Sequence, residues 1–295
     1  MEYRVLKYFL AVAREENITR AADILHISQP ALSRQLMSLE EELGVQLLVR
    51  GKRSVTLTDA GMLLRRRAQE IVNLTEKTAE EFGAGGENLA GKIAIGSGEA
   101  ETMRFVAQCM REFGDGHPEV TFEIYSNDAD FVRERLEKGL LDIGVLIEPV
   151  DLSRYEYIRL PQKERWGALL PSDCPAARKE GISPHDLAGM KVFMPQRAVA
   201  QGVAEWFGEE FSALDVNTTY NLLYNAAMLV ESGMGAALTI EGAASLYGNP
   251  KMVFRPFTPE HAVTSVLVWK KYQPYSAAVS AFLEHIRMRL DYDGR

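Results

Sequence analysis

A short polar run near the N-terminus carries side chains that could read the edges of DNA bases. It holds Gln29, Ser33 and Arg34, with Pro30 between them. In the major groove Gln favours adenine, Arg favours guanine and Ser accepts either base. A helix that presents these side chains can enter the groove. An ordinary amphipathic surface helix would show the same polar face, so the run alone leaves both interpretations open.

The apolar residues around this run predict the helix that would position it. They recur at steps of four, three and four: Leu32, Leu36, Leu39 and Leu43. That spacing places them on one face of an α-helix, opposite the polar run. Ser28 can cap the helix, and Pro30 falls in the first turn, where its missing N–H costs nothing. Gly44 should end it.

The preceding segments predict two more helices. Residues 19–25 read as a short helix that Thr19 would cap, joined by a tight connection to the Ser28 helix. Two helices joined so closely form a helix-turn-helix. Residues 3–16 form a first amphipathic helix, whose inward face would carry Val5, Leu6, Phe9, Leu10 and Ala13.

The order of residues in this region resembles the N-terminal signature of the LysR-type transcriptional regulators. The matching positions are Ala21-Ala22, Leu25, Ser28-Gln29-Pro30-Ala31-Leu32-Ser33, Leu39-Glu40, Leu43-Gly44, Leu47, Arg50, Leu57-Thr58 and Ala60-Gly61. One departure is Leu48, where the family usually has Phe. The resemblance implies a bacterial, DNA-binding transcription factor. Its expected fold is a winged helix-turn-helix, a long linker helix and a two-lobed α/β domain like the type 2 periplasmic-binding proteins.

Two short strands and a basic turn follow the Ser28 helix and predict the wing. Residues 45–50 and 54–57 are the strands, and residues 51–53 are the turn. Its tip would meet phosphates or the minor groove, although a solvated charged turn is the alternative. The predicted DNA contacts are Thr19, Gln29, Pro30, Ser33, Arg34, Arg50, Lys52 and Arg53.

A long helix from residue 59 to about residue 82 is expected to pair two chains. A heptad spacing selects the seam residues, which are Leu64, Ala68, Ile71, Thr75, Thr78 and Phe82. The threonines and the alanine make this a weak zipper by itself, but the resemblance implies a dimer, and beyond it a tetramer. Arg65, Arg66 and Arg67 could touch phosphate or form a solvated face. Four glycines between residues 83 and 91 predict a hinge.

Strands and helices alternate after residue 91, which predicts a largely parallel sheet. The expected strands are 93–96, 120–126, 141–147, 166–170, 191–194, 216–220, 236–239 and 263–269. The expected helices are 102–113, 129–138, 199–211, 224–232 and 276–290. We expect three parts: a DNA-binding domain at 1–58, a linker at 59–90 and an effector-binding domain at 91–295. By resemblance, lobe I spans about 91–161 and 267–295, and lobe II about 162–266.

Parallel sheets bind ligands beyond the carboxyl ends of their strands, and polar residues at those ends predict an effector site. They are Ser97, Thr102, Asn127, Gln196, Arg197, Asn221, Tyr224 and Thr239. Hydroxyls and helix N-termini suit anions, and in the family carboxylate-bearing metabolites often bind there. Glu99, Glu101, Asp128 and Glu148 crowd the same rim and could instead favour an amine or a zwitterion. Loop capping is the alternative role for each residue.

Charge and cysteine content fit this layout. The net charge of −8 divides unevenly: residues 1–67 hold eleven Lys and Arg against eight Asp and Glu, or +3, and the remainder holds 22 against 33, or −11. Positive charge therefore concentrates where phosphates would be met. The N-terminus has no apolar signal region and no run spans a membrane, so we expect a cytoplasmic protein without membrane partners. Cys109 and Cys174 form no disulfide framework, and a redox switch has no matching context. Cys174 lies in a polar loop, where we expect an exposed thiol.

Two other classes of protein, besides a ligand-responsive transcription factor, share parts of this layout. A solute-binding protein or DNA-independent ligand sensor would share the C-terminal layout but needs no wing. An enzyme would need a catalytic motif, and no Walker A, G-x-S-x-G or H-E-x-x-H pattern occurs. The five histidines are scattered and suggest no metal site. We therefore expect no enzyme activity, cofactor or metal. The expected partners are operator DNA, a second copy, a small metabolite of unknown identity and, by resemblance, RNA polymerase.

Overall fold

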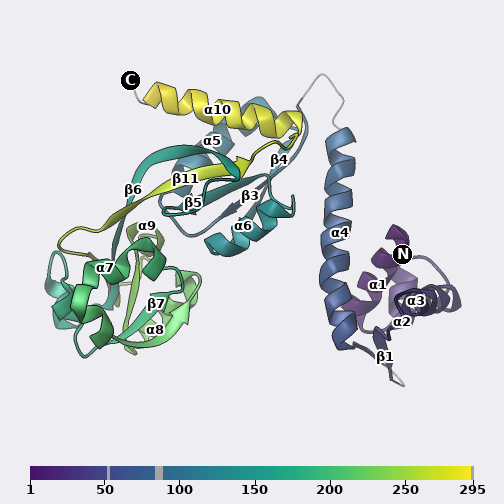
Figure 1. The fold of residues 1–295 in the computed structure, drawn as a ribbon, viewed down its shortest axis with the longest axis horizontal. Helices are drawn as coiled ribbons and strands as arrows, with labels where there is room; N and C mark the ends of the chain where they lie inside the picture. The colour runs from purple at the N-terminus through teal and green to yellow at the C-terminus, as the bar shows by residue number, and fades with distance from the viewer. Residues whose placement is uncertain (52–53, 84–88, 294–295) are drawn as a thin grey trace. The chain divides into compact units, whose positions relative to one another are not determined.

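The computed structural model describes the chain except residues 52–53, 84–88 and 294–295, and it leaves out the side chains at 77, 80–83, 200 and 293. The chain divides into two compact units, an N-terminal unit (Met1–Gly85) and a C-terminal unit (Gly86–Arg295). Figure 1 shows both, and each is described by itself below.

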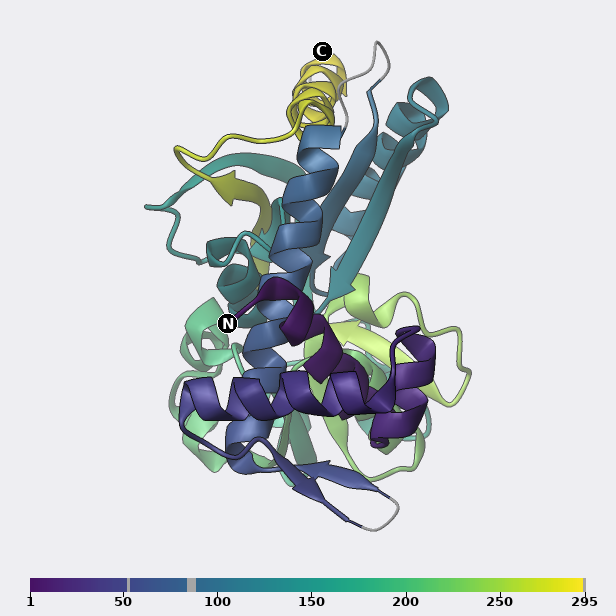
Figure 2. The same ribbon diagram turned by 90° about the vertical axis from the view of Figure 1, so that its right-hand side faces the viewer.

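The N-terminal unit is a winged helix-turn-helix followed by a long helix. Its elements are α1 (Tyr3–Glu15), α2 (Ile18–Ile24), α3 (Gln29–Leu43), β1 (Leu48–Arg50), β2 (Val55–Leu57) and α4 (Asp59–Gly83). The two strands pair antiparallel, with Leu48 opposite Leu57 and Arg50 opposite Val55. Figure 2 shows this hairpin below α3 and connected to the start of α4.

The helix ends differ from the prediction in three details. Asn17, not Thr19, caps α2: its Oδ1 accepts a hydrogen bond from the Arg20 backbone N–H at 3.0 Å. Ser28 occupies the N-cap position of α3 without a side-chain cap bond, although Pro30 does lie in the first turn. Leu43 is 39% exposed because α3 ends there, at Gly44 with φ of +67°, beyond the edge of the core.

The core of this unit takes one face from each helix and the base of the hairpin. Phe9, Leu32, Leu36 and Leu48 are at most 1% exposed. Helix α4 joins the same cluster through Ala68 and Val72, so the first half of the linker helix packs against this core.

In its described residues, the C-terminal unit is built on a nine-stranded sheet, in which eight strands form one hydrogen-bonded path and the ninth pairs beside it. The strands are β3 (Gly91–Ser97), β4 (Val120–Ser126), β5 (Ile143–Ile147), β6 (Tyr155–Pro171), β7 (Lys191–Pro195), β8 (Asp215–Tyr220), β9 (Ala236–Ile240), β10 (Met252–Pro256) and β11 (Ala262–Lys270). The order is β4-β3-β5-β11-β6-β9-β7-β8, and β10 pairs with β6.

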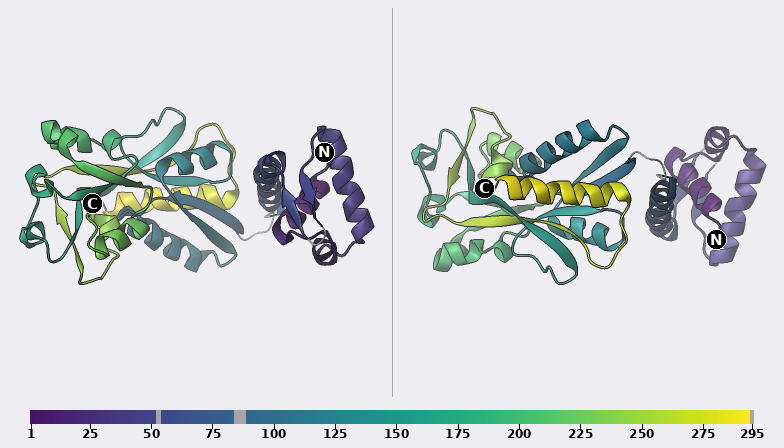
Figure 3. Two further views of the ribbon diagram at one scale, coloured as in Figure 1. Left: turned by 90° about the horizontal axis from the view of Figure 1, so that it is seen from below. Right: turned by 90° about the horizontal axis from the view of Figure 1, so that it is seen from above.

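Helices cover this sheet on both faces. They are α5 (Thr102–Gly116), α6 (Ala129–Glu137), α7 (Val203–Phe207), α8 (Leu223–Glu231), α9 (Glu241–Ala244) and α10 (Ala277–Asp293). Short 3₁₀ helices lie at η1 (Pro175–Arg178), η2 (Pro184–Leu187), η3 (Val199–Gln201) and η4 (Gly208–Ala213). In lobe I, α5 and α10 lie side by side on one face of the sheet (Figures 1 and 3). Between them Phe113 meets Phe282, with ring centroids 5.3 Å apart. Helix α6 packs on the other face.

The sheet is more mixed than predicted. Pairs β3–β4, β3–β5, β7–β8 and β7–β9 are parallel. Strands β6 and β11 are antiparallel to each other, and β6 is also antiparallel to β9 and β11 to β5. These two strands cross between the lobes: the upstream part of β6 contributes Leu160 to one core of lobe I, and its downstream part contributes Trp166 to Leu170 to the core of lobe II.

Two predictions within lobe II were wrong in detail. The expected helix at 199–211 breaks into η3, α7 and η4, because Gly202 and Gly208 adopt φ of +82° and +58°, which a continuous right-handed helix excludes. Strand β10 and helix α9 were not predicted from the sequence. Cys174 is partly buried against the lobe II core, whereas the sequence suggested an exposed thiol.

Candidate functional site

Helix α3 has one buried face and one free face. Leu32, Leu36 and Leu39 are buried in the unit's core, whereas Gln29 and Arg34 are exposed. Pro30 is exposed as well, and Ser33 is half-buried. The packing of the leucines therefore presents the predicted base-reading side chains outward.

The base of the hairpin is tied to α3 through Arg50. The Arg50 Nη1 donates to the Ser33 Oγ at 2.9 Å, and the Arg50 Nη2 lies 3.8 Å from a carboxylate oxygen of Glu40. The other Glu40 oxygen accepts from the backbone N–H groups of Leu47 and Leu48, at 2.7 and 3.0 Å. Two side chains of α3 thus orient the first strand of the hairpin. Lys52 and Arg53, at the predicted tip, lie outside the described residues.

The residues predicted to pair α4 with a second chain fall into a buried group and an exposed group. Ala68 is fully buried and Leu64 packs partly buried in the core that α4 shares with α1, so Ala68 cannot meet a partner chain while that packing holds. The prediction for Ala68 was therefore wrong. Heptad spacing identifies the residues on one face of a helix, but it does not show whether that face packs within the chain or against a second chain.

The second half of the seam is free on the outer surface of α4. Ile71 is 39% exposed, and Leu63 and Leu74, outside the predicted set, are 54% and 44% exposed. Thr75 and Thr78 are exposed, and each hydroxyl donates to the carbonyl four residues earlier, at 2.8 Å. The Phe82 side chain lies outside the described residues.

A cavity lies between the two lobes of the C-terminal unit and encloses about 770 Å³, including its mouth. Lobe I contributes the loop after β3, the start of α6 and the end of β5. Lobe II contributes Trp166, the loop after β7, the loop before α8 and the end of β9. Ligand sites occur preferentially at interfaces between domains, so this cavity is the candidate effector site.

The structure places four of the eight predicted effector residues in the wall of this cavity. They are Gln196, Arg197, Asn221 and Thr239. Asn127 lies next to the wall, and its Oδ1 accepts from the Asn221 Nδ2 across the lobes at 3.2 Å. Tyr224 is 57% exposed and lies outside the lining, because it occupies the outer side of α8.

Ser97 and Thr102 do not line the cavity. Ser97 is 2% exposed, and its hydroxyl donates to the neighbouring Gly98 carbonyl at 2.8 Å. Thr102 is fully buried at the start of α5, where its N–H and hydroxyl donate to a Glu164 carboxylate oxygen at 3.2 and 3.3 Å. The chain's own carboxylate thus occupies the helix N-terminus at which an effector anion was predicted.

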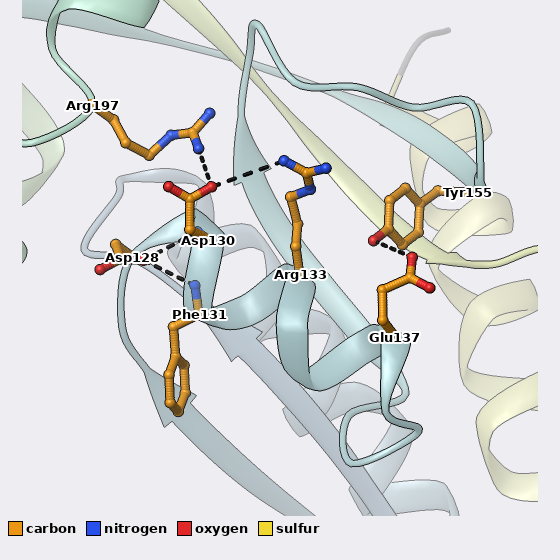
Figure 4. A network of polar contacts seen from close by, with 7 residues as sticks. All are labelled: Asp128, Asp130, Phe131, Arg133, Glu137, Tyr155 and Arg197. Atoms are coloured by element: carbon orange, nitrogen blue, oxygen red, sulfur yellow. Dashed lines mark hydrogen bonds and ion pairs between the residues drawn. The ribbon is translucent and has the colours of Figure 1, made fainter.

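Further polar contacts join the lobes beside the cavity. The Arg197 guanidinium reaches from the loop after β7 to the Asp130 carboxylate on α6, and Figure 4 shows Arg133 approaching the same carboxylate. The Leu223 N–H, at the start of α8, donates to a Glu99 oxygen at 2.6 Å. These contacts link the loop after β3 and helix α6 in lobe I to lobe II.

Burial shifts the pKa values of two carboxyl groups at this interface upward. The Glu99 pKa is raised because burial disfavours its charged form, partly offset by the Leu223 N–H and Tyr247 hydroxyl bonds. The Glu164 pKa is raised for the same reason, partly offset by backbone N–H groups around Thr102 and Gly242. The Tyr247 pKa rises to about 12, mainly through burial and then through the nearby Glu99 charge.

The sequence placed Glu99 and Asp128 only among the acids that crowd the rim, and no sequence signal pointed to Trp166 and Gln201 in the cavity wall. Trp166 begins the expected strand at 166–170, so its place was predicted but not the cavity beside it. In the described part of the chain, no group of three metal-ligating side chains gathers and no helix has the length and apolarity to cross a membrane.

Comparison with known proteins places both units in one family. Residues 3–62 match the model of the bacterial regulatory helix-turn-helix protein, lysR family, and residues 86–291 match the LysR substrate binding domain. The Hca operon transcriptional activator HcaR of Escherichia coli (strain K12) is 31% identical over 303 residues, with 98% of each chain covered. The nitrogen assimilation regulatory protein nac of the same organism is 32% identical, covering 83% of this chain and 80% of its own.

Solved structures share the fold. CbnR, a LysR family transcriptional regulator, aligns with a TM-score of 0.76 at 21% identity, covering 98% of this chain and 99% of that one. CbnR complexed with its target DNA aligns equally well, at 22% identity. The two family matches and the HcaR relationship confirm the resemblance identified from the sequence. The chain belongs to the LysR family of DNA-binding transcriptional regulators, with an N-terminal helix-turn-helix and a C-terminal effector-binding domain.

Proposed function

We propose that this regulator binds a two-fold-symmetric operator in the cytoplasm as a dimer or a tetramer of such dimers, and that a small molecule in the interlobe cavity changes how it binds or bends that DNA. The observation that carries the DNA-binding part is the free polar face of α3, where Gln29, Ser33 and Arg34 stand opposite the buried leucines. In a helix-turn-helix these positions meet base edges in the major groove.

A dimer would allow the protein to bind a two-fold-symmetric operator. Each chain supplies one recognition helix, and a palindrome needs two, separated by about 34 Å or a multiple of it. The exposed stripe of Leu63, Ile71 and Leu74 on α4 gives a second copy an apolar surface to cover. We infer that α4 pairs there, with Thr75 and Thr78 beside the stripe.

Effector control rests on the cavity and on the contacts that cross it. The lobes are joined by the Arg197–Asp130 ion pair and by the Glu99 contact to the start of α8. A ligand that binds one arrangement of the lobes better than another shifts their equilibrium by that difference in affinity, typically about 1–3 kcal/mol. Activation or repression, and a contact with RNA polymerase, would follow from the resulting DNA geometry.

Selection of DNA by the full-length protein tests this function. The protein is incubated with a random-sequence duplex library, and bound DNA is recovered and sequenced over several rounds. We expect an inverted repeat whose half-sites lie about one helical turn, or a whole number of turns, apart, bound more weakly as salt is raised. Failure to enrich any sequence, with protein shown to be folded by circular dichroism, would contradict the proposal.

A further inference from the structure

The ionisable side chains in the cavity wall give it an excess of negative charge. Glu99 and Asp128 contribute carboxylates, and Arg197 contributes the guanidinium. The Arg197 Nη1 is already engaged by Asp130, outside the lining. A ligand carrying several negative charges would therefore be repelled.

Glu99 is a partly buried carboxylate without a cationic partner among the described residues. One oxygen accepts the Leu223 N–H at 2.6 Å, and its remaining contact, with Tyr247, is uncharged. Burial disfavours the charged form of Glu99 and raises its pKa, and no cation among the described residues offsets this effect. Because a buried carboxylate gains most from a cation and from further hydrogen-bond donors, Glu99 is suited to hold an ammonium group.

Two residues of the cavity wall have N–H groups that need a hydrogen-bond acceptor. The Nε1 of Trp166 and the Nε of Arg197 are buried, and neither has a hydrogen-bond partner in the described part of the chain. Trp166 is only 2% exposed. Buried N–H groups without partners are rare in folded proteins, so an oxygen supplied by a ligand or by water would satisfy them.

The helix N-termini around the cavity are already used by the chain itself. Glu164 accepts from the start of α5, Asp128 from the start of α6 at 2.9 and 3.0 Å, and Glu99 from the start of α8. These bonds occupy the backbone donors that would otherwise attract an effector anion. A ligand oxygen is therefore left with side-chain donors, of which Trp166 and Arg197 have unpaired N–H groups.

We propose that the effector is a zwitterion with an apolar body, of the class of amino acids with hydrocarbon side chains. Its ammonium group faces Glu99, and its carboxylate accepts from Trp166 and Arg197. Its hydrocarbon part lies against the apolar wall, which includes Val145, Ile147 and Ile240. This inference rests on the proposed effector control and names the chemistry of the same cavity.

Two sets of ligands test the inference, and within each set the hydrocarbon skeleton is the same while the charged groups differ. Isothermal titration of the full-length protein at neutral pH compares L-phenylalanine with 3-phenylpropionate and 2-phenylethylamine, and L-leucine with 4-methylpentanoate and 3-methylbutylamine. The remaining hydrocarbon amino acids complete the panel. We expect at least one zwitterion to bind about tenfold or more tightly than its acid and its amine, since each loses one charged contact.

Three variants assign the contacts. Glu99→Gln keeps an acceptor for the Leu223 N–H but removes the charge, so zwitterion affinity should fall about tenfold while the acid binds at least as well as before. Trp166→Phe should weaken the zwitterion and the acid but not the amine. Glu101→Gln, which changes a neighbouring carboxylate outside the cavity lining, should leave all affinities unchanged.

Two results would overturn the inference. In the first, each zwitterion binds no more tightly than its own matched acid or amine. In the second, no hydrocarbon amino acid binds. Operator binding is measured in the same samples on the selected DNA. If wild type binds that DNA while the amino acids fail, only the effector class is wrong. If wild type selects no DNA, the proposed function itself fails.

Discussion

The Arg50 guanidinium donates to the Ser33 hydroxyl at 2.9 Å, so two side chains predicted to meet DNA are hydrogen-bonded to each other in the free protein. One lies on the hairpin and the other on the recognition helix. A guanidinium has five N–H donors, and a hydroxyl can still donate its own hydrogen, so both can contact DNA while this bond persists. The bond therefore orients the hairpin relative to α3 before DNA arrives.

A double-mutant cycle tests this relationship. We expect Ser33→Ala and Arg50→Ala each to weaken operator binding, and the double variant to lose less than the sum by about 0.5–1.5 kcal/mol, the range of a single hydrogen bond. Affinities are measured by fluorescence anisotropy on the selected operator. Strict additivity would show that the two side chains act independently on DNA.

Arg34 should read a base. It is exposed on the free face of α3, and Arg pairs bidentately with guanine. Arg34→Ala should lose about 1–3 kcal/mol on the selected operator and relax the preference at one position, with little change on random DNA. Arg104→Ala removes an exposed arginine of the C-terminal unit and serves as the control. Equal losses on both DNAs would instead assign Arg34 to a phosphate.

The two roles of α4 can be separated by substitutions on its two faces. Ala68→Leu should lower the stability of the N-terminal unit by about 1–3 kcal/mol, because Ala68 is fully buried and a larger side chain must displace its neighbours in the core. Ile71→Glu should leave that stability nearly unchanged but weaken dimerisation at least about tenfold, since it places charge in the exposed stripe. Urea unfolding and sedimentation velocity measure the two effects. A dimer unaffected by Ile71→Glu would move the interface elsewhere.

Glu40 should stabilise the connection between α3 and the hairpin. Its carboxylate accepts two backbone N–H groups, from Leu47 and Leu48, and its side chain is only 17% exposed. Glu40→Ala should cost about 1–3 kcal/mol in the free energy of unfolding, because both donors lose their partner. Glu41→Ala, on the exposed side of the same turn, is the matched control. A loss no larger than that of the control would show that water replaces the carboxylate.

Glu164 should make the stability of the C-terminal unit depend on pH. Its pKa in the folded chain lies above its ordinary value of 4.5, mainly because of burial, so the folded chain holds this proton more tightly than the unfolded chain. The resulting stabilisation is fully present below pH 4.5 and is lost as pH rises through the folded-state pKa.

Glu164→Gln should remove this dependence, because Gln resembles the protonated side chain. The three tryptophans, Trp166, Trp206 and Trp269, all lie in the C-terminal unit, so their fluorescence follows its unfolding in urea. We expect the variant to gain stability relative to wild type between pH 5 and about pH 8. Glu284→Gln changes an exposed carboxylate and is the control. Parallel pH profiles for wild type and Glu164→Gln would contradict the assignment.

Much of the architecture was predictable because local periodicity is strong. The leucine spacing of α3 and the glycine at its end predicted the recognition helix, and the alternation of strands and helices predicted an α/β unit. Gln29 and Arg34 were predicted on the outer face because residues opposite a buried stripe must face away from it. The family resemblance supplied the order of domains, which local patterns alone do not contain.

Tertiary packing decided the rest. The heptad spacing predicted that Ala68 lies on an apolar stripe, but the packing of α1 against α4 made that position part of the core and not of an interface. The sequence placed Thr102 at a helix N-terminus, but β6 brings Glu164 there from 62 residues away and fills the anion position. Trp166, Glu99 and Arg197 come from three distant segments and share a cavity only because β6 and β11 cross between the lobes. Periodicity reports which residues share a face, whereas long-range pairing decides what each face meets.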